Sequence, residues 1–262
     1  MNIMIMSHDN EALLKECVRR IKQFTPIEYE LVIVDDASEV PYKAEDYEAL
    51  IVRMPKRSNC CNLRNVGMEM CASDIVIWLD NDTMVSEGWY VPLLEAMKDP
   101  EVGLAGQKGD SRLIRKPFLP LTQAECMIEY QFAYDYNHLN NQCDFITSYC
   151  VAVRKSAYRP TFCYNMPTPC LDPELGAVVK VNGYKVVVTE KLNVEHKGSQ
   201  TPRPQGKEYL HHLAENFTKW WSFWEPHKEI FELYKGECAY EHDANEPNRL
   251  ASKNTHGDYD KD

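Results

Sequence analysis

A helical pattern runs directly into an apolar strand in residues 62–83, which have the sequence NLRNVGMEMCASDIVIWLDNDT. The strand-like part, residues 74–80, is apolar between its two end aspartates, and Asp82 follows Asp80 after one residue. Two carboxylates at this spacing belong either to a solvated acidic turn or to a site for a hard divalent cation, which prefers oxygen ligands. The position after a buried-looking strand improves the case for the cation.

Strands and helices alternate on the amino-terminal side of this stretch. Apolar runs occupy residues 2–6, 29–36 and 49–54, and apolar side chains recur at helical spacing in residues 10–24. Apolar strands separated by helices are typical of a parallel sheet covered on both faces, and ligands of such sheets bind at the carboxyl ends of the strands. Four aspartates fall at such ends: Asp35, Asp36, Asp80 and Asp82.

The second half of the chain continues this pattern less regularly. We expect a helix at residues 88–98, strands at residues 102–106 and 144–153, and a helix, glycine turn and strand within residues 172–188. Residues 208–235 have a helical pattern with tryptophans along one side, which is more typical of core packing than of a sugar platform.

Three regions follow from these patterns. The sequence predicts an α/β domain over residues 1–200 and a C-terminal loop and amphipathic helix, packed on that domain, over residues 201–241. Residues 242–262 are polar and predict a poorly ordered tail.

Composition narrows the class of protein. The 262 residues carry a formal net charge of −11, which disfavours nucleic acid as a partner because a phosphate-backbone binder needs a positive field. No apolar run approaches the ~20 residues that a membrane-spanning helix needs. The first ten residues lack the features of a signal peptide, and the ten cysteines contain no C-x-x-C pair. We therefore expect a cytoplasmic protein with reduced thiols and no transmembrane segment.

Four segments occur in an order that matches a known enzyme family. They are LVIVDDAS (31–38), the opening stretch (62–83), LDPELGAVVKVNGYKVVV (171–188) and VEHKGS (194–199). Together they resemble family 2 glycosyltransferases with the GT-A fold, over residues 2–200. The resemblance implies a Rossmann-like, mostly parallel nucleotide-binding sheet with helices on both faces and a C-terminal helical extension. It also implies inverting transfer of one sugar from a nucleoside-diphosphate sugar, usually a UDP-sugar, to an acceptor hydroxyl.

The resemblance implies donor-binding roles for five residues. Asp36 would bond the base or ribose of the nucleotide, and the backbone around Asp9 would contact the nucleotide. Arg64 and Asn65 would lie near the diphosphate and the donor sugar. Asp80 would contact the ribose or sugar.

The resemblance also implies a divalent metal, Mn²⁺ or Mg²⁺, and a general base. Asp82 and His196 would bind the metal together with Asp80. By spacing, Asp172 falls on the position of the base that takes the proton from the acceptor, and Glu174 is the competing candidate. The family often has glutamate where this chain has Leu171, and an arginine common after this segment is absent. The Gln-x-x-Arg-Trp signature of processive synthases is absent too, so single-sugar transfer is expected.

Several alternatives remain open on the sequence. The expected acceptor belongs to a glycan or polysaccharide pathway, with a protein or a modified nucleic-acid base as the alternative. A nucleotidyltransferase would usually carry a Gly-rich basic first loop, which the segment MSHDNEALL (6–14) lacks. A non-catalytic module that binds nucleotide-sugars is a third reading, and a homodimer is left open. Asp35 is expected to serve as a turn or cap residue.

Overall fold

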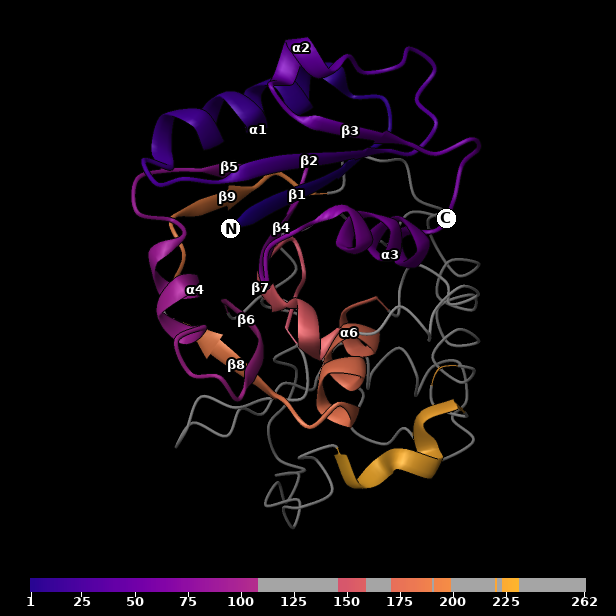
Figure 1. Cartoon of the computed structure of the whole chain (residues 1–262), viewed down its shortest axis with the longest axis vertical. Helices are drawn as coiled ribbons and strands as arrows, with labels where there is room; N and C mark the ends of the chain where they lie inside the picture. Colours follow the sequence, from indigo (N-terminus) through magenta and orange to yellow (C-terminus); the bar gives the residue numbers. More distant parts are fainter. Residues whose placement is uncertain (108–145, 159–170, 190, 199–219, 221–222, 231–262) are drawn as a thin grey trace, which may run out of the picture.

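The computed structural model describes residues 1–107, 146–158, 171–189, 191–198, 220 and 223–230. Within these residues the centre of the molecule is a seven-stranded sheet with the order β3-β2-β1-β4-β7-β6-β8 (Figure 1). Its strands are β1 (Asn2–Ser7), β2 (Glu30–Asp35), β3 (Leu50–Arg53), β4 (Ile75–Asp80), β6 (Val102–Gln107), β7 (Cys150–Arg154) and β8 (Lys185–Thr189). All neighbouring pairs are parallel except those of β7, which runs antiparallel to both β4 and β6.

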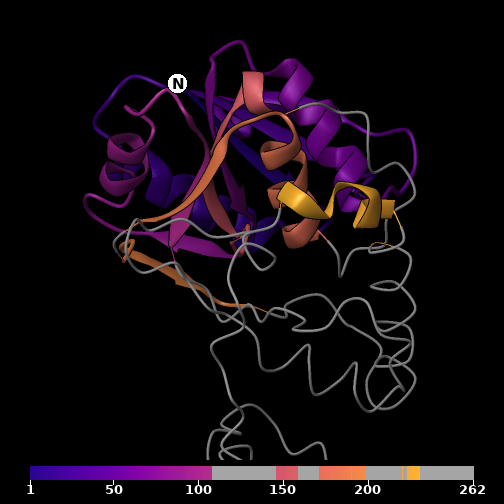
Figure 2. The same ribbon diagram turned by 90° about the horizontal axis from the view of Figure 1, so that it is seen from below.

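Helices cover both faces of the sheet, as predicted (Figures 1 and 2). Successive strand side chains point to opposite faces. Ile3 and Ile5 therefore belong to one core cluster, whereas Met4 belongs to the other. The first cluster includes buried side chains of α1 (Glu11–Phe24) and α4 (Val91–Ala96), and the second includes those of α3 (Cys60–Met70) and α6 (Leu171–Val181). The short helical pieces are α2 (Ala44–Tyr47), η1 (Lys155–Ala157) and η3 (Glu225–Ile230).

Gly67 allows α3 to lie close to the sheet. A Cβ atom at this position would come within 2.2 Å of Met4 Sδ and 2.9 Å of Val34 Cγ2, closer than packed atoms approach. The glycine therefore sets the distance between α3 and the strands β1 and β2. Arg64 and Asn65 are buried on the same helix.

Two predicted elements differ from the structure. The strand expected from residue 144 begins at Cys150, and the residues 146–149 before it form no strand. The continuous helix expected over 208–235 is wrong at Glu225–Ile230, which form a 3-10 segment with non-helical angles at His227. Pro226 accounts for this change, since proline removes an N–H donor and clashes within a helix interior. The remainder of that helix lies largely outside the described residues, as does the predicted tail; the region boundaries stay a prediction.

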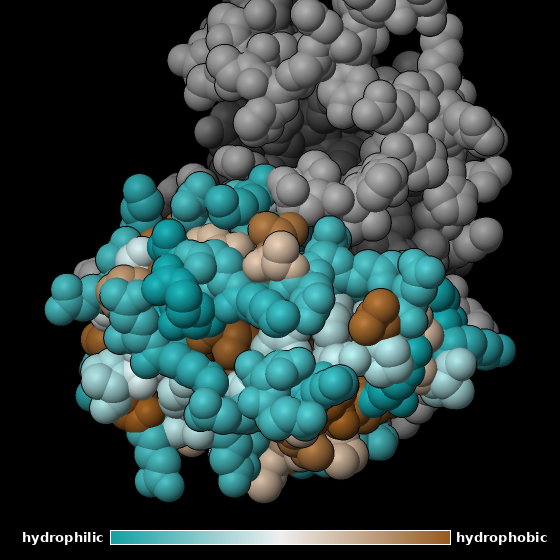
Figure 3. Space-filling model, turned by 90° about the horizontal axis from the view of Figure 1, so that it is seen from above, coloured by the Kyte–Doolittle hydropathy of each residue, from teal (hydrophilic) through white to brown (hydrophobic). Residues whose placement is uncertain are grey.

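The face of the molecule seen from above agrees with the polar composition. In the view from above, the coloured residues are mostly hydrophilic, and hydrophobic residues occur as separate spots (Figure 3). Among the described helices, none combines the length and apolar character needed to cross a bilayer.

Candidate metal and nucleotide site

A second, two-stranded sheet places His196 close to Asp80 and Asp82. Strand β5 (Thr83–Val85) pairs antiparallel with β9 (Val194–His196), and the register sets His196 opposite Thr83. Just before Thr83, the main-chain carbonyl of Asp82 accepts a hydrogen bond from the Lys197 N–H at 3.1 Å. Backbone pairing therefore fixes the imidazole beside the turn that follows β4.

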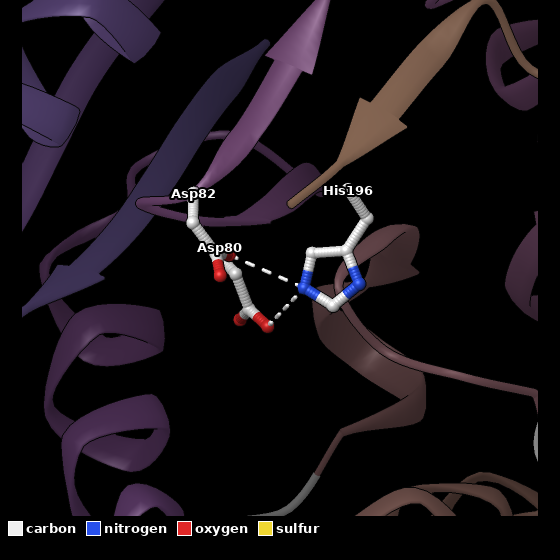
Figure 4. A group of neighbouring side chains, drawn as sticks. All are labelled: Asp80, Asp82 and His196. Atoms are coloured by element: carbon white, nitrogen blue, oxygen red, sulfur yellow. Dashed lines mark ion pairs between the residues drawn. The ribbon is translucent and has the colours of Figure 1, made fainter. Parts of the chain in front are cut away.

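The three predicted metal ligands converge at this point (Figure 4). His196 Nε2 lies 3.2 Å from Asp82 Oδ1 and 3.8 Å from Asp80 Oδ2. The ring of Tyr149 stacks on the imidazole with centroids 4.4 Å apart and an interplanar angle of 6°. The side chain of Asp82 is 10% exposed, against 37% for Asp80. Asp82 is thus the more firmly enclosed carboxylate.

The donor set fits one divalent ion. The ligand atoms of Asp80, Asp82 and His196 all lie within 4.8 Å of one another. Metal–ligand bonds of about 2.1 Å place two ligand atoms on opposite sides of one ion about 4.2 Å apart. Side-chain shifts of a few tenths of an ångström would therefore let all three residues bind the same ion. Two carboxylate oxygens and one imidazole nitrogen suit Mn²⁺ or Mg²⁺, with further positions left for substrate oxygens.

The Asp80 carboxyl has an unusual proton affinity. Although its side chain is partly exposed, burial raises the pKa of Asp80 to about 6 from an ordinary 3.8. The positive charges of Arg64 and His196 oppose this rise in pKa, whereas the carboxylates of Asp82 and Asp172 add to it. A cation between the carboxylates would relieve the part of this rise in pKa that comes from the neighbouring negative charges.

Metal affinity should therefore depend on pH. Metal binding requires the carboxylate form, so below pH 6 a proton on Asp80 competes with the ion. We expect the apparent Mn²⁺ affinity to fall about tenfold or more for each pH unit below 6. Calorimetric Mn²⁺ titrations between pH 5 and pH 8 measure this, and Asp80→Asn should show a shallower dependence. An identical pH dependence in wild type and Asp80→Asn would contradict the assignment.

Asp35 and Asp36, at the end of β2, have different environments. Asp35 Oδ1 accepts the Ser38 N–H at 2.9 Å, which confirms its expected role in the turn. Asp36 Oδ1 accepts the Ser58 N–H at 2.7 Å, and its Oδ2 pairs with Arg57 Nε at 2.9 Å. The Asp36 carboxylate, predicted to contact the nucleotide, is therefore held by the segment that leads into α3.

Asp9 joins the loop after β1 to the loop after β2. Its φ of 49° is left-handed, its N–H donates to Ser38 Oγ at 2.9 Å, and its Oδ1 accepts the Glu39 N–H at 2.8 Å. The predicted nucleotide contact at Asp9 thus lies next to that of Asp36. Ser38 supports both loops, and no sequence pattern singled it out.

Arg64 and Asn65 are both buried on α3. The guanidinium of Arg64 lies over the Trp78 ring, 4.8 Å from its centroid, and donates from Nη2 to Ser148 Oγ at 2.6 Å. Asn65 Oδ1 accepts a hydrogen bond from the Tyr158 hydroxyl. Arg64 therefore brings a buried positive charge near Asp80 and Asp172, while Asn65 ties α3 to the segment after β7.

The two candidate bases lie in the first turn of α6 and have different partners. Asp172 Oδ1 accepts hydrogen bonds from the N–H and the hydroxyl of Ser148, and burial raises the pKa of Asp172 against the opposing effects of Ser148 and Arg64. Glu174 is buried, and its Oε2 accepts from the indole N–H groups of Trp220 at 2.9 Å and Trp224 at 2.6 Å. These contacts make Glu174 an anchor for the C-terminal segment and favour Asp172 as the base.

The two tryptophans confirm the expectation of core packing. Trp220 is 5% exposed and Trp224 is fully buried, so neither offers a ring face to a sugar. Trp221 lies outside the described residues.

Most of the predicted site residues lie at the carboxyl ends of neighbouring strands, along one edge of the sheet. Asp36 follows β2, Asp9 follows β1 and Asp80 ends β4, and these three strands are neighbours. Asn81 Nδ2 donates to Ser7 Oγ at 3.0 Å, which links the acidic turn to the end of β1. This edge of the sheet therefore holds the three candidate metal ligands, the two loops at the adjacent strand ends and the candidate base Asp172.

Comparisons with known proteins agree with this geometry. The family model described as glycosyl transferase family 2 matches residues 2–162. Two curated relatives from Mycobacterium tuberculosis strains CDC 1551 / Oshkosh and ATCC 25618 / H37Rv, both named pre-mycofactocin glycosyltransferase, are 29% identical over 83 residues. The match covers 30% of this chain and 18% of each relative, so it spans only a small part of their length.

Two solved structures share the fold. The crystal structure of GalNAc-T7 with UDP, GalNAc and Mn²⁺ has a TM-score of 0.56 at 18% identity, covering 91% of this chain and 52% of the other. The crystal structure of S. aureus TarS has a TM-score of 0.50 at 10% identity, covering 74% of this chain and 36% of the other. At these identities the likeness concerns the fold alone.

Proposed function

The chain belongs to glycosyl transferase family 2 and has the GT-A fold that its sequence predicted, and on this premise we propose that it transfers a single sugar. The donor is a nucleoside-diphosphate sugar, a UDP-sugar in the first instance, and the acceptor is a hydroxyl group of a glycan or related molecule. Transfer proceeds with inversion at the anomeric carbon. The observation that carries the proposal is the cluster of Asp80, Asp82 and His196 at the carboxyl edge of the sheet.

The donor would bind along this edge. Asp80, Asp82 and His196 would hold a divalent ion, which when bound neutralises the charge that develops on the departing diphosphate. GalNAc-T7 was crystallised with UDP and Mn²⁺, which makes these the first choice to test here. The nucleotide can contact Asp36 only if it shares this carboxylate with Arg57 or displaces the Arg57 side chain, which is 58% exposed.

The transfer step then needs a proton acceptor. As the acceptor oxygen forms its bond to the anomeric carbon, the bond from that carbon to the diphosphate oxygen breaks, and the diphosphate leaves with the electron pair. The acceptor O–H proton passes to Asp172. The raised pKa of Asp172 suits this role, because a general base works best when its pKa approaches the working pH.

A second function is a non-catalytic nucleotide-sugar-binding module. The loops at the ends of β1 and β2 and the metal cluster would serve binding alone. Such a module has no need for a carboxyl group with a raised pKa near the candidate metal ligands. The position of Asp172 therefore favours the enzyme.

A donor screen tests the proposal. We expect one nucleotide-sugar at about 100 times its Kd, with Mn²⁺, to stabilise the protein by about 2.7 kcal/mol, which corresponds to a rise in melting temperature of about 5–10 °C. Thermal melts with UDP-, GDP- and dTDP-sugars, each with Mn²⁺ or with EDTA, measure this. Product analysis of the stabilising donor then separates transfer from binding alone. Equal stabilisation in EDTA would contradict the metal-dependent part of the proposal.

A further inference from the structure

Ser148 connects the buried arginine to the candidate base. It lies in the turn before β7 and is 4% exposed. Arg64 Nη2 lies 2.6 Å from Ser148 Oγ, and that oxygen also contacts Asp172 Oδ1. The Ser148 N–H donates to the same Asp172 oxygen at 3.1 Å. One residue therefore makes both of the hydrogen bonds that the described part of the chain gives to Asp172.

The chemistry of the three groups fixes the direction of these bonds. A guanidinium only donates, so Ser148 Oγ must accept from Arg64. A hydroxyl has one proton, and an ionised carboxylate only accepts, so that proton is donated to Asp172 Oδ1. The chain of bonds runs from the positive to the negative group without an alternative arrangement. Hydrogen bonds with charged ends are the stronger ones, so this arrangement holds the carboxylate firmly.

The two oxygens of Asp172 consequently differ. Oδ1 accepts two hydrogen bonds from Ser148, one from the backbone and one from the side chain. Because these two donors approach the same oxygen, they set the rotation of the carboxylate about its Cβ–Cγ bond. Among the described residues none donates a hydrogen bond to Oδ2, which leaves this oxygen to accept a proton from outside the network.

We propose that Ser148 is a positioning residue for the general base, holding Asp172 Oδ1 so that Oδ2 takes the acceptor proton. The inference rests on the proposed function, with Asp172 as the base. It adds a residue that acts through Asp172 and touches neither donor nor acceptor. A merely structural role, such as holding the start of α6, would alter stability and leave the turnover number of the folded enzyme unchanged.

A double-mutant cycle separates these roles. The variants Ser148→Ala, Asp172→Asn and the combination of both are compared with wild type in steady-state transfer assays, which give kcat and KM for the donor identified by the screen, and in single-turnover assays with excess enzyme. A misplaced catalytic group costs up to about a hundred-fold in rate, so we expect Ser148→Ala to lower kcat about ten- to a hundred-fold. The donor KM should stay within about twofold of wild type, because the Ser148 hydroxyl forms its hydrogen bonds with Arg64 and Asp172 and not with the donor. In the Asp172→Asn background the same substitution should have almost no further effect, because coupled groups are not additive.

The outcomes distinguish this inference from the proposed function. Unchanged kcat in Ser148→Ala, with Asp172→Asn impaired, would overturn the role of Ser148 and leave the proposed function standing. An equal loss in both backgrounds would also overturn it, because Ser148 would then act independently of Asp172. No transfer by wild type with any donor would overturn both. If thermal melts show that Ser148→Ala does not fold, Ser148→Cys takes its place, since it preserves most of the volume and replaces the hydroxyl by a weak donor.

Discussion

Asp82→Ala is expected to lower kcat/KM for sugar transfer about a thousand-fold at fixed Mn²⁺, equivalent to about 4 kcal/mol of transition-state stabilisation. Asp82 is the most enclosed of the three candidate ligands, and its Oδ1 lies 3.2 Å from His196 Nε2. Removing this carboxylate leaves a partly exposed aspartate and an imidazole, which bind a hard cation weakly. Steady-state transfer assays with a Mn²⁺ titration measure the loss.

The matched control for Asp82→Ala is Glu195→Ala. Glu195 is exposed on β9 directly before His196, but it pairs with Met84 in the register and is not part of the ligand cluster. Each substitution removes one negative charge, Glu195→Ala from β9 and Asp82→Ala from the residue directly before β5. We expect Glu195→Ala to keep the Mn²⁺ dependence of wild type. Full activity of Asp82→Ala at ordinary Mn²⁺ concentrations would refute the metal site.

Asp172→Asn is expected to reduce the rate of transfer about 10²- to 10⁴-fold, which is the usual contribution of a general base. Asparagine has nearly the same shape, and its carbonyl oxygen can accept the two hydrogen bonds from Ser148. The protein should therefore fold normally and bind the nucleotide-sugar with an affinity within about twofold of wild type. A general base stabilises the transition state and contributes little to the binding of the donor in the ground state. Donor-induced thermal stabilisation and single-turnover rates measure the two properties separately.

Glu174→Gln is the comparison for Asp172→Asn. The amide oxygen of glutamine can accept from the indole N–H groups of Trp220 and Trp224, so the anchor should be kept. We expect turnover close to that of wild type. The reverse pattern, with full turnover in Asp172→Asn and loss in Glu174→Gln, would move the role of base to Glu174.

The parallel half of the fold could be predicted because its strands are apolar on both faces. Ile3 and Met4 are adjacent in β1 and enter opposite cores, so a continuous apolar run was the correct signal for a sheet covered on both sides. The direction of β7 could not be predicted, since its apolar sequence suits a parallel or an antiparallel strand equally well. Its partners depend on which strand edges remain available in the folded sheet.

The candidate site could be predicted in part for residues that directly follow apolar strands. It was harder to predict for residues that are far apart in the sequence and come together only in the folded protein. The ends of the apolar runs pointed to Asp36 and Asp80, but the resemblance to the family was needed to choose Asp36 over Asp35 and to select His196. Its strand β9 has only three residues, which is too short for a periodic pattern. Ser148 carried no signal, because a single serine gains its role only when α6 brings Asp172 to it.

The order of strands in the sheet has a consequence for how the chain folds during synthesis. β7 lies between β4 and β6 although β6 precedes it in the sequence, so β6 has no partner in the main sheet until β7 has been made. β9 follows later still, and it supplies His196, the last of the three candidate metal ligands. A nascent chain that ends at residue 162 would contain Asp80 and Asp82 but neither Asp172 nor His196. Such long-range pairings form slowly, and the three candidate metal ligands could therefore come together only after β9 has been made and has paired with β5.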